Sequence, residues 1–264
     1  MVRKLARDPV IATLAALPDR AEYLSRVVDS LLPQVDAVVV WLNGWSAEDR
    51  SRWIPRLPAK VRIEHGRKVD GVTPNVGDAG KFVSLPEFVG YRLTCDDDLE
   101  YGPDYVGHMV KGVERYGLSD YVEHMIAGVE RYGRKAVVSL HGRRFTAFPV
   151  ESYYRGTRES FHCLAEQLQY EPVHCPGTGV MCYHTDTISF SEDDFPLPNM
   201  ADLHVGLKCE KLGIPRIALA HPKGMITHLP IDLTTTIHAQ LRNRDEAQTR
   251  LVNSIEWTSL TEVV

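Results

Sequence analysis

The sequence has few cysteines, no excess of positive charge and no long hydrophobic run. Its five cysteines are odd in number and include no C-x-x-C pair, which argues against a zinc site or a disulfide framework and favours buried, reduced thiols. A net charge of −5 argues against a positively charged surface that binds nucleic acid. No apolar run approaches the ~20 residues that a transmembrane segment needs. Neither a G-x-G-x-x-G loop nor a P-loop occurs.

The composition is that of an ordinary globular protein, with 44% hydrophobic and 25% charged residues. The basic start MVRKLARDPV contains no apolar stretch long enough for export, so we expect a cytoplasmic protein. Peripheral attachment to the inner face of the membrane is compatible with this composition. No pattern in the sequence indicates the oligomeric state.

Apolar runs and helical patterns alternate along the first half of the chain. Val10–Ala16, Ala37–Leu42 and Val61–Glu64 are predicted strands, and Ala21–Leu32 has apolar residues at helical spacing. Further predictions are the strands Gly90–Cys95, Ala136–Leu140, Gly179–Tyr183 and Arg216–Ala220 and the helix Leu203–Leu212. This alternation predicts an α/β fold, Rossmann-like, in which a mostly parallel sheet carries helices on both faces.

One segment is repeated in tandem. Asp104–Gly117 (DYVGHMVKGVERYG) recurs as Asp120–Gly133 (DYVEHMIAGVERYG), sixteen residues further along. Gly117-Leu118-Ser119 between the copies is typical of a helix stop followed by a new N-cap. We therefore expect two short helices joined by a tight turn, as a surface addition without a chemical role.

The predicted domain spans residues 1–230. A nucleotide-binding half covers about 8–100, and an acceptor half covers about 134–230. The extension 231–264 has no recognisable motif; its Thr234–Thr236 precedes a polar, helical segment that would either cover the active site or contact another subunit.

Three successive carboxylates, Asp96, Asp97 and Asp98, follow the predicted strand Gly90–Cys95. Their repulsion must be relieved by a cation, by protonation or by solvation, and a solvated acidic turn is the plain alternative to a site. Mg²⁺ or Mn²⁺ is the natural partner, since substrate phosphates can complete the shell of an ion held by one or two carboxylates. In an extended segment Asp96 and Asp98 would point the same way and Asp97 the opposite way.

Other polar residues lie where ligands bind in such sheets, beyond the carboxyl ends of strands. Asn43 follows the strand Ala37–Leu42, which favours a nucleotide there. Lys81 follows a glycine-rich turn and is placed to reach a diphosphate as a point charge. In the turn that opens the strand Gly179–Tyr183, Gly177, Thr178 and Gly179 allow close backbone approach to a sugar. Lys81 as a surface lysine and the glycines as a plain turn are the alternatives.

The segment CDDDLEYGPDYV resembles the D-x-D motif of GT-A-fold glycosyltransferases, in particular bacterial family-2-like enzymes that read DDDxxYPPDY. The opening strand-helix-strand, GDAGKF (Gly77–Phe82) and NMADLHVGLKCEKLGIP (Asn199–Pro215) resemble further segments of this family in the same order. The resemblance covers roughly residues 8–225.

The resemblance implies an inverting transfer from a UDP-sugar to a hydroxyl acceptor, in enzymes that often build surface polysaccharides. Asp96 would contact the ribose or base, Asp98 would bind Mn²⁺ or Mg²⁺, and Asp97 would support either role. Asp202 would be the general base, with a helix N-cap as its alternative role.

Relatives sometimes place a late histidine on the metal, and the choice between His221 and His228 stays open. Asp193 and Asp194 are weaker candidates for the base. Arg143 and Arg144 could meet phosphate or an anionic acceptor, although a solvated basic turn is the simpler interpretation.

Two other classes remain possible. A metal-dependent nucleotidyltransferase or phosphohydrolase would use the same carboxylates around phosphate. A non-catalytic module of the same fold would have lost activity, and an insertion beside a metal strand could cause such a loss.

Overall fold

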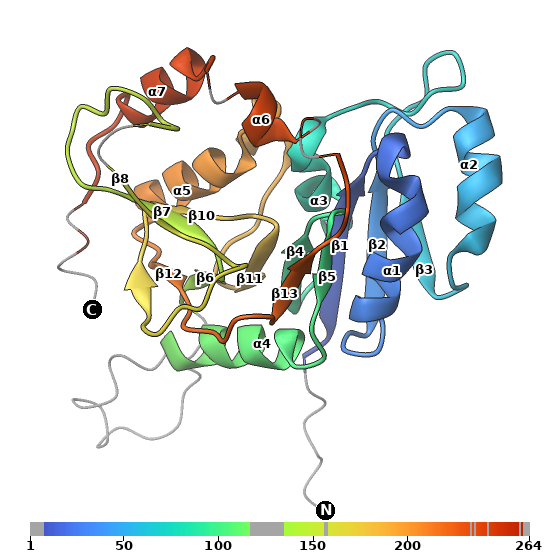
Figure 1. Cartoon of the computed structure of the whole chain (residues 1–264), viewed down its shortest axis with the longest axis horizontal. Coiled ribbons are helices and arrows are strands. Elements are labelled where there is room, and N and C mark those ends of the chain that lie inside the picture. Colours follow the sequence, from blue (N-terminus) through green and yellow to red (C-terminus); the bar gives the residue numbers. More distant parts are fainter. Residues whose placement is uncertain are drawn as a thin grey trace, which may run out of the picture.

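The computed structural model describes residues 8–116, 135–155, 158–232, 234, 236–241, 243–258 and 260. Within them an eight-stranded sheet forms the centre, with strand order β3-β2-β1-β4-β11-β6-β12-β9 (Figure 1). Its strands are β1 (Val10–Ala16), β2 (Ala37–Leu42), β3 (Val61–Glu64), β4 (Tyr91–Cys95), β6 (Val137–Ser139), β9 (Glu171–Pro172), β11 (Val180–His184) and β12 (Arg216–Ala218).

The first half of this sheet is parallel, and the second half is mixed. β3, β2, β1 and β4 run in the same direction, as do β6 and β12. β11 runs antiparallel between β4 and β6, so Val180 at its start pairs with Cys95 at the end of β4. The carboxyl ends of β1, β2 and β4 and the start of β11 therefore share one edge of the sheet.

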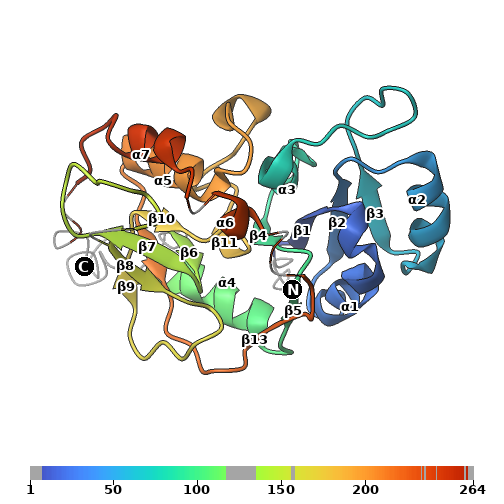
Figure 2. The ribbon, with the colours of Figure 1, turned by 45° about the horizontal axis from the view of Figure 1, so that its top comes forward.

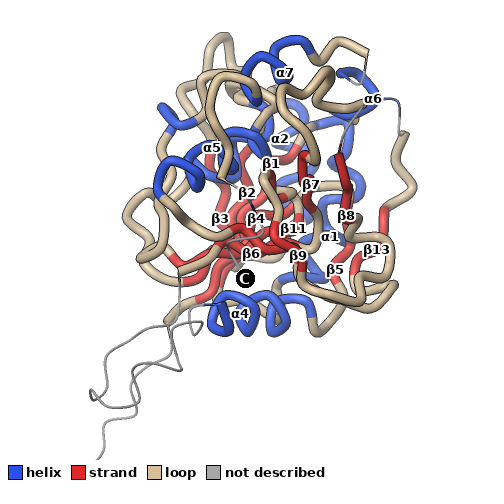
Figure 3. Tube along the Cα trace, turned by 90° about the vertical axis from the view of Figure 1, so that its left-hand side faces the viewer, coloured by secondary structure: helices blue, strands red, loops and turns tan. Residues whose placement is uncertain are grey.

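Helices cover both faces of the sheet. α1 (Ala21–Leu31) and α4 (Tyr105–Tyr116) cover one face, while α3 (Gly80–Val83) and α5 (Ala201–Leu212) cover the other. The side chains of β11 alternate between the two faces. Val180 and Cys182 lie in the core that contains α1 and α4, and Met181 lies in the core that contains α3 and α5. Figure 3 shows α4 beneath the sheet and α6 (Ile237–Leu241) and α7 (Glu246–Val252) at the opposite end.

The helix α1 shows why the sequence folds this way. Leu24, Val27, Val28 and Leu31 follow the spacing i, i+3, i+4 and i+7, and all are buried in the core that β1 and β2 also enter. Burial of each such side chain contributes roughly 1.5–3 kcal/mol. β1 and β2 are apolar almost throughout because both of their faces are covered.

Smaller elements complete the fold. β10 (Cys175–Pro176), β7 (Gly142–Phe145) and β8 (Arg158–Phe161) form a three-stranded sheet, and β5 (Leu99–Tyr101) pairs with β13 (Ile226–His228). The helix α2 (Ala47–Trp53) begins with a capping box between Ser46 and Asp49. Figure 2 shows α6 and α7 on the same side of the molecule as α5.

The predicted α/β class is confirmed, with a mostly parallel sheet between helices. All five cysteines are buried and free, as expected. The first copy of the tandem repeat forms α4, whereas the second copy, with its expected cap at Ser119, lies outside the described residues. Among the helices that the structure describes, none is long and apolar enough to cross a membrane.

Candidate active site

A cavity of about 410 Å³ opens at the sheet edge where β1, β2 and β4 end. Leu17 follows β1, Asn43 follows β2 and Asp96 follows β4, while Thr178 lies just before β11. Asp202 and Leu203 at the start of α5 also line it, as do Thr236 just before α6, Ile237 and Gln240 of α6, and Gln248 of α7. Residues of the C-terminal extension thus line part of the cavity.

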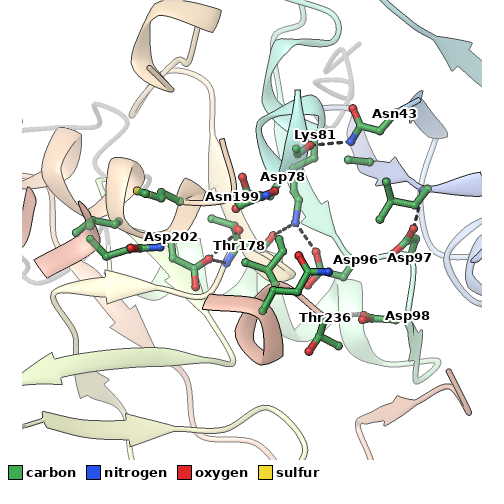
Figure 4. A pocket seen from close by; sticks show the side chains of 18 of the residues that line it. Asn43, Asp78, Lys81, Asp96, Asp97, Asp98, Thr178, Asn199, Asp202 and Thr236 are labelled. Carbon is green, nitrogen blue, oxygen red and sulfur yellow. Dashed lines mark hydrogen bonds and ion pairs between the residues drawn. The ribbon is translucent and has the colours of Figure 1, made fainter. Parts of the chain in front are cut away.

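An ion pair between Lys81 and Asp96 forms the centre of the cavity (Figure 4). The Lys81 side chain is only 3% exposed, and its Nζ also lies 3.5 Å from the carbonyl oxygen of Thr178. Burial by itself would lower the pKa of Lys81, but the carboxylates of Asp96 and Asp78 outweigh it and raise the pKa to about 12. Lys81 is therefore a fixed, buried cation, in contrast to the surface lysine that was the alternative.

Gly179 lets the carboxylate of Asp96 lie directly against the backbone. A Cβ atom on Gly179 would stand 1.9 Å from Asp96 Oδ2. The backbone N–H of Asp96 donates to the Tyr101 hydroxyl at 2.7 Å, and that hydroxyl donates to the Gly179 carbonyl at 2.7 Å. Tyr101 thus joins β4 to the start of β11 and positions Asp96.

Asp97 and Asp98 share a different cation. Arg20 Nη1 lies 2.7 Å from Asp97 Oδ1 and 3.0 Å from Asp98 Oδ2, and Asp97 Oδ2 accepts the Leu17 N–H at 2.9 Å. The chain turns at Asp97 and Asp98, so the strict alternation expected of an extended segment is wrong. Burial and the carboxylate of Asp96 raise the pKa of Asp98 to about 6.

The structure separates the two candidate histidines. His228 on β13 lies beside the acidic cluster, where Leu229 N–H donates to the Asp98 carbonyl at 2.9 Å. Its Nδ1 lies 2.7 Å from the carbonyl oxygen of Leu229. His221 is buried beside His108 of α4 and pairs with Gln167. Neither His221 nor His228 is among the residues that line the cavity.

Asp202 stands on the other side of the cavity, near the start of α5. Its Oδ1 accepts the backbone N–H and the hydroxyl of Thr178, each at 2.8 Å, and its Oδ2 lies 3.4 Å from Arg143 Nη1. Burial would raise the pKa of Asp202, but Arg143 and the Thr178 N–H outweigh it and lower the pKa. Met200 is the N-cap residue of α5, so the alternative role of Asp202 as the cap is wrong.

Asn43 and Asp78 organise the loop between β3 and α3. Asn43 Nδ2 donates to the Gly77 carbonyl at 2.7 Å, and its Oδ1 accepts the Val76 N–H at 3.1 Å. Asp78 Oδ2 accepts the Ala201 N–H at the start of α5, at 2.9 Å. Burial raises the pKa of Asp78 to about 6. Both side chains line the cavity.

The glycine turn before β11 is part of the site through its middle residue. Thr178 lines the cavity, whereas Gly177 packs so closely on His141 that a Cβ atom added to the glycine would stand 2.7 Å from the histidine Cβ. The weaker candidates for the base lie elsewhere, since Asp194 pairs with Lys208 at 2.7 Å and Asp193 is exposed. Arg144 pairs with Glu159 and Glu171.

Sequence reasoning missed several residues that line the cavity, among them Arg20, Tyr153, Tyr154 and Gln248, and it favoured a solvated turn for Arg143. Arg20 had a usable signal, since it lies in the connection after β1, at the same sheet edge as the acidic cluster. Arg143 is held in the wall by the Tyr153 hydroxyl at 2.7 Å. Nothing in the local sequence around Tyr153 or Gln248 indicates this position.

The acidic cluster offers the oxygen donors that a hard divalent cation prefers. Three carboxylates, Asp96 to Asp98, face two cations, Lys81 and Arg20, so one negative charge in this group has no counterpart. Over the described part of the chain, no three His, Cys, Asp or Glu side chains form a complete metal site. A cation at Asp96 and Asp98 would therefore need further ligands from a bound molecule, such as a phosphate.

The fold and the site together define an α/β protein with a polar cavity at the carboxyl edge of its sheet. No protein-family model and no curated protein matches this chain. Solved structures similar to it include the following three. TarS 1–349 of S. aureus is 13% identical with a TM-score of 0.44, over 81% of this chain and 59% of that one. 4-Diphosphocytidyl-2C-methyl-D-erythritol synthase is 11% identical with a TM-score of 0.39, over 90% of this chain and 99% of that one. The galactosyltransferase LgtC, in complex with donor and acceptor sugar analogs, is 11% identical with a TM-score of 0.34, over 94% of this chain and 97% of that one.

Proposed function

We propose that this protein is a glycosyltransferase that moves a sugar from a nucleotide-diphosphate donor, a UDP-sugar, to a hydroxyl acceptor with inversion at the anomeric carbon. The observation that carries the proposal is the layout of one cavity. Asp96 and Asp98 follow the parallel strand β4, and Asp202 lies across the cavity on α5. The activity would belong to the cytoplasm or the inner face of the membrane, in polysaccharide synthesis.

The nucleotide is assigned to the side of Asn43, Leu17 and Arg20, where two parallel strands end. The diphosphate would then lie between Asp98 and the buried ammonium of Lys81, and the ribose or base near Asp96. Lys81 and Arg20 would offset part of the phosphate charge. Mn²⁺ or Mg²⁺, held by Asp98 with Asp96 and His228 beside it, would stabilise the leaving diphosphate as a Lewis acid.

Asp202 is assigned as the general base. Its lowered pKa keeps it ionised at neutral pH, and Thr178 holds its Oδ1 with two hydrogen bonds. Oδ2, with one longer contact to Arg143, is the oxygen assigned to the acceptor hydroxyl. The hydroxyl proton passes to Oδ2, the hydroxyl oxygen bonds to the anomeric carbon, and the bond to the diphosphate breaks with its electron pair on the phosphate oxygen.

A donor screen tests this proposal. The protein is incubated with Mn²⁺ and individual UDP-sugars, and release of UDP is measured with and without carbohydrate acceptors. The proposal expects release from at least one UDP-sugar that depends on the metal. Release of inorganic phosphate from simple phosphoesters, or of diphosphate from nucleoside triphosphates, would instead favour a phosphohydrolase or nucleotidyltransferase. No response to any metal–nucleotide pair would favour a non-catalytic module.

A further inference from the structure

The helix α7 is fastened to the cavity wall by three polar side chains. Asp245 Oδ2 accepts the Ser152 hydroxyl at 2.5 Å and the Tyr154 N–H at 2.7 Å. Thr249 Oγ1 accepts the Tyr153 N–H at 3.0 Å, and Asn253 exchanges two hydrogen bonds of 2.9 Å with the backbone of Val150. These residues are spaced four apart, so they hold one side of the helix against residues 150–154.

Gln248 belongs to the same helix but has no such bond. Its side chain lines the cavity and is 1% exposed, and neither its Nε2 nor its Oε1 has a hydrogen-bond partner among the described residues. A buried carboxamide without partners is costly, and native proteins rarely keep one without a reason. A rigid helix that holds such a group at the wall of a cavity is a preorganised recognition element.

The chemistry of the amide restricts what it can recognise. Nε2 donates and Oε1 accepts, so the group suits a neutral partner that does both, such as the hydroxyls or acetamido group of a sugar. A phosphate would leave the Oε1 acceptor facing negative charge. Gln248 also lies next to Thr249, whose hydroxyl accepts the Tyr153 N–H, and the Tyr153 hydroxyl in turn accepts from Arg143, the partner of Asp202.

The geometry points to Gln248 as a specificity-determining residue that hydrogen-bonds a carbohydrate ring in the Asp202 half of the cavity. This inference rests on the proposed glycosyltransferase function and adds a residue of the C-terminal extension to its sugar site. The ring belongs either to the donor sugar or to the acceptor, and the two sources give different results in the same experiment.

The test replaces the amide by an apolar side chain of the same length, Gln248→Met, with Gln169→Met on the exposed surface as a matched control. Each protein is titrated with UDP and with the UDP-sugar that the donor screen selects, in Mn²⁺, and its melting temperature is recorded. Gln248→Met should keep or raise the melting temperature, because it removes an unpartnered buried polar group. A donor-sugar contact should weaken UDP-sugar binding roughly tenfold and leave UDP binding unchanged.

An acceptor contact should leave both titrations unchanged and raise the KM for the acceptor by a similar factor. Gln248→Asn keeps the amide on a shorter side chain and should show the same loss of binding or the same rise in KM. This variant replaces Gln248→Met in the experiment if the methionine variant does not fold. Wild-type values of binding and KM in either variant would overturn the inference while the proposed function stands. If the wild-type protein binds neither UDP nor any UDP-sugar, both are overturned.

Discussion

Replacing Gly179 with alanine should damage the protein through Asp96, although neither residue is altered in charge. The new Cβ would stand 1.9 Å from Asp96 Oδ2 and 2.5 Å from its Cγ. The carboxylate would have to retreat by roughly 1.5 Å to reach an ordinary van der Waals separation. That movement breaks its ion pair with Lys81, whose side chain is 3% exposed.

The size of the effect follows from which partner is left behind. Removing one member of a buried ion pair costs about 3–5 kcal/mol, because the other charge stays buried without compensation. The Asp96 side chain is 39% exposed and can turn toward water, so we expect the lower end of this range, about 3 kcal/mol. The cost should therefore reside mainly at Lys81.

Urea unfolding followed by circular dichroism measures this loss. Gly107→Ala is the matched control, since Gly107 is exposed on α4 with nothing within 4 Å of its Cβ position, and alanine there should stabilise by roughly 0.5–1 kcal/mol. In an Asp96→Ala background, Gly179→Ala should cost little, because the atoms it strikes are gone. Equal unfolding midpoints for Gly179→Ala and the wild type would refute this description of the site.

Two further substitutions test the titratable groups of the cavity. Burial raises the pKa of Asp78 from 3.8 to about 6, so the folded protein loses up to about 3 kcal/mol of stability as pH rises from 4 through 6, at about 1.4 kcal/mol per pKa unit. Asp78→Asn should remove this loss, so its free energy of unfolding in urea should exceed that of the wild type at pH 8 but not at pH 4. A difference in free energy of unfolding that is the same at both pH values would contradict this prediction. Asp202→Asn should lower kcat roughly 10²–10⁴-fold while UDP-sugar affinity is kept, with the exposed Asp193→Asn as control, and full activity in Asp202→Asn would reassign the base.

The central sheet was predictable because its strands are apolar runs with abrupt polar ends. β1, β2 and β3 have the predicted bounds. Burial on both faces leaves little room for polar residues inside β1 and β2. β3 (VRIE) is an edge strand that carries Arg62 and Glu64, and it was predicted from its alternating valine and isoleucine. β7 (GRRF) and β8 (RESF) were missed because they pair in a small sheet and carry charged side chains. Their strand character depends on the partner strand, which no local pattern reveals.

The site was predictable where it follows the sheet edge and unpredictable where distant segments close over it. Asn43 and Asp96 line one cavity because the parallel strands β2 and β4 end at the same sheet edge, and Thr178 joins them because the antiparallel strand β11 begins there. At the turn, Asp97 and Asp98 both contact Arg20. The alternating pattern of an extended chain does not predict such a shared contact. Gln248 reaches the cavity only because α7 packs on residues 150–154.

The central claim is that a cation and a diphosphate meet at Asp98, and calorimetric titration of UDP tests it most directly. In the wild type, UDP should bind in the presence of Mn²⁺ and at least tenfold more weakly without it, a difference of about 1.4 kcal/mol. Asp98→Asn should abolish this metal dependence while its melting temperature without ligand shows a folded protein. Equal UDP affinity for both proteins, with and without Mn²⁺, would contradict the account.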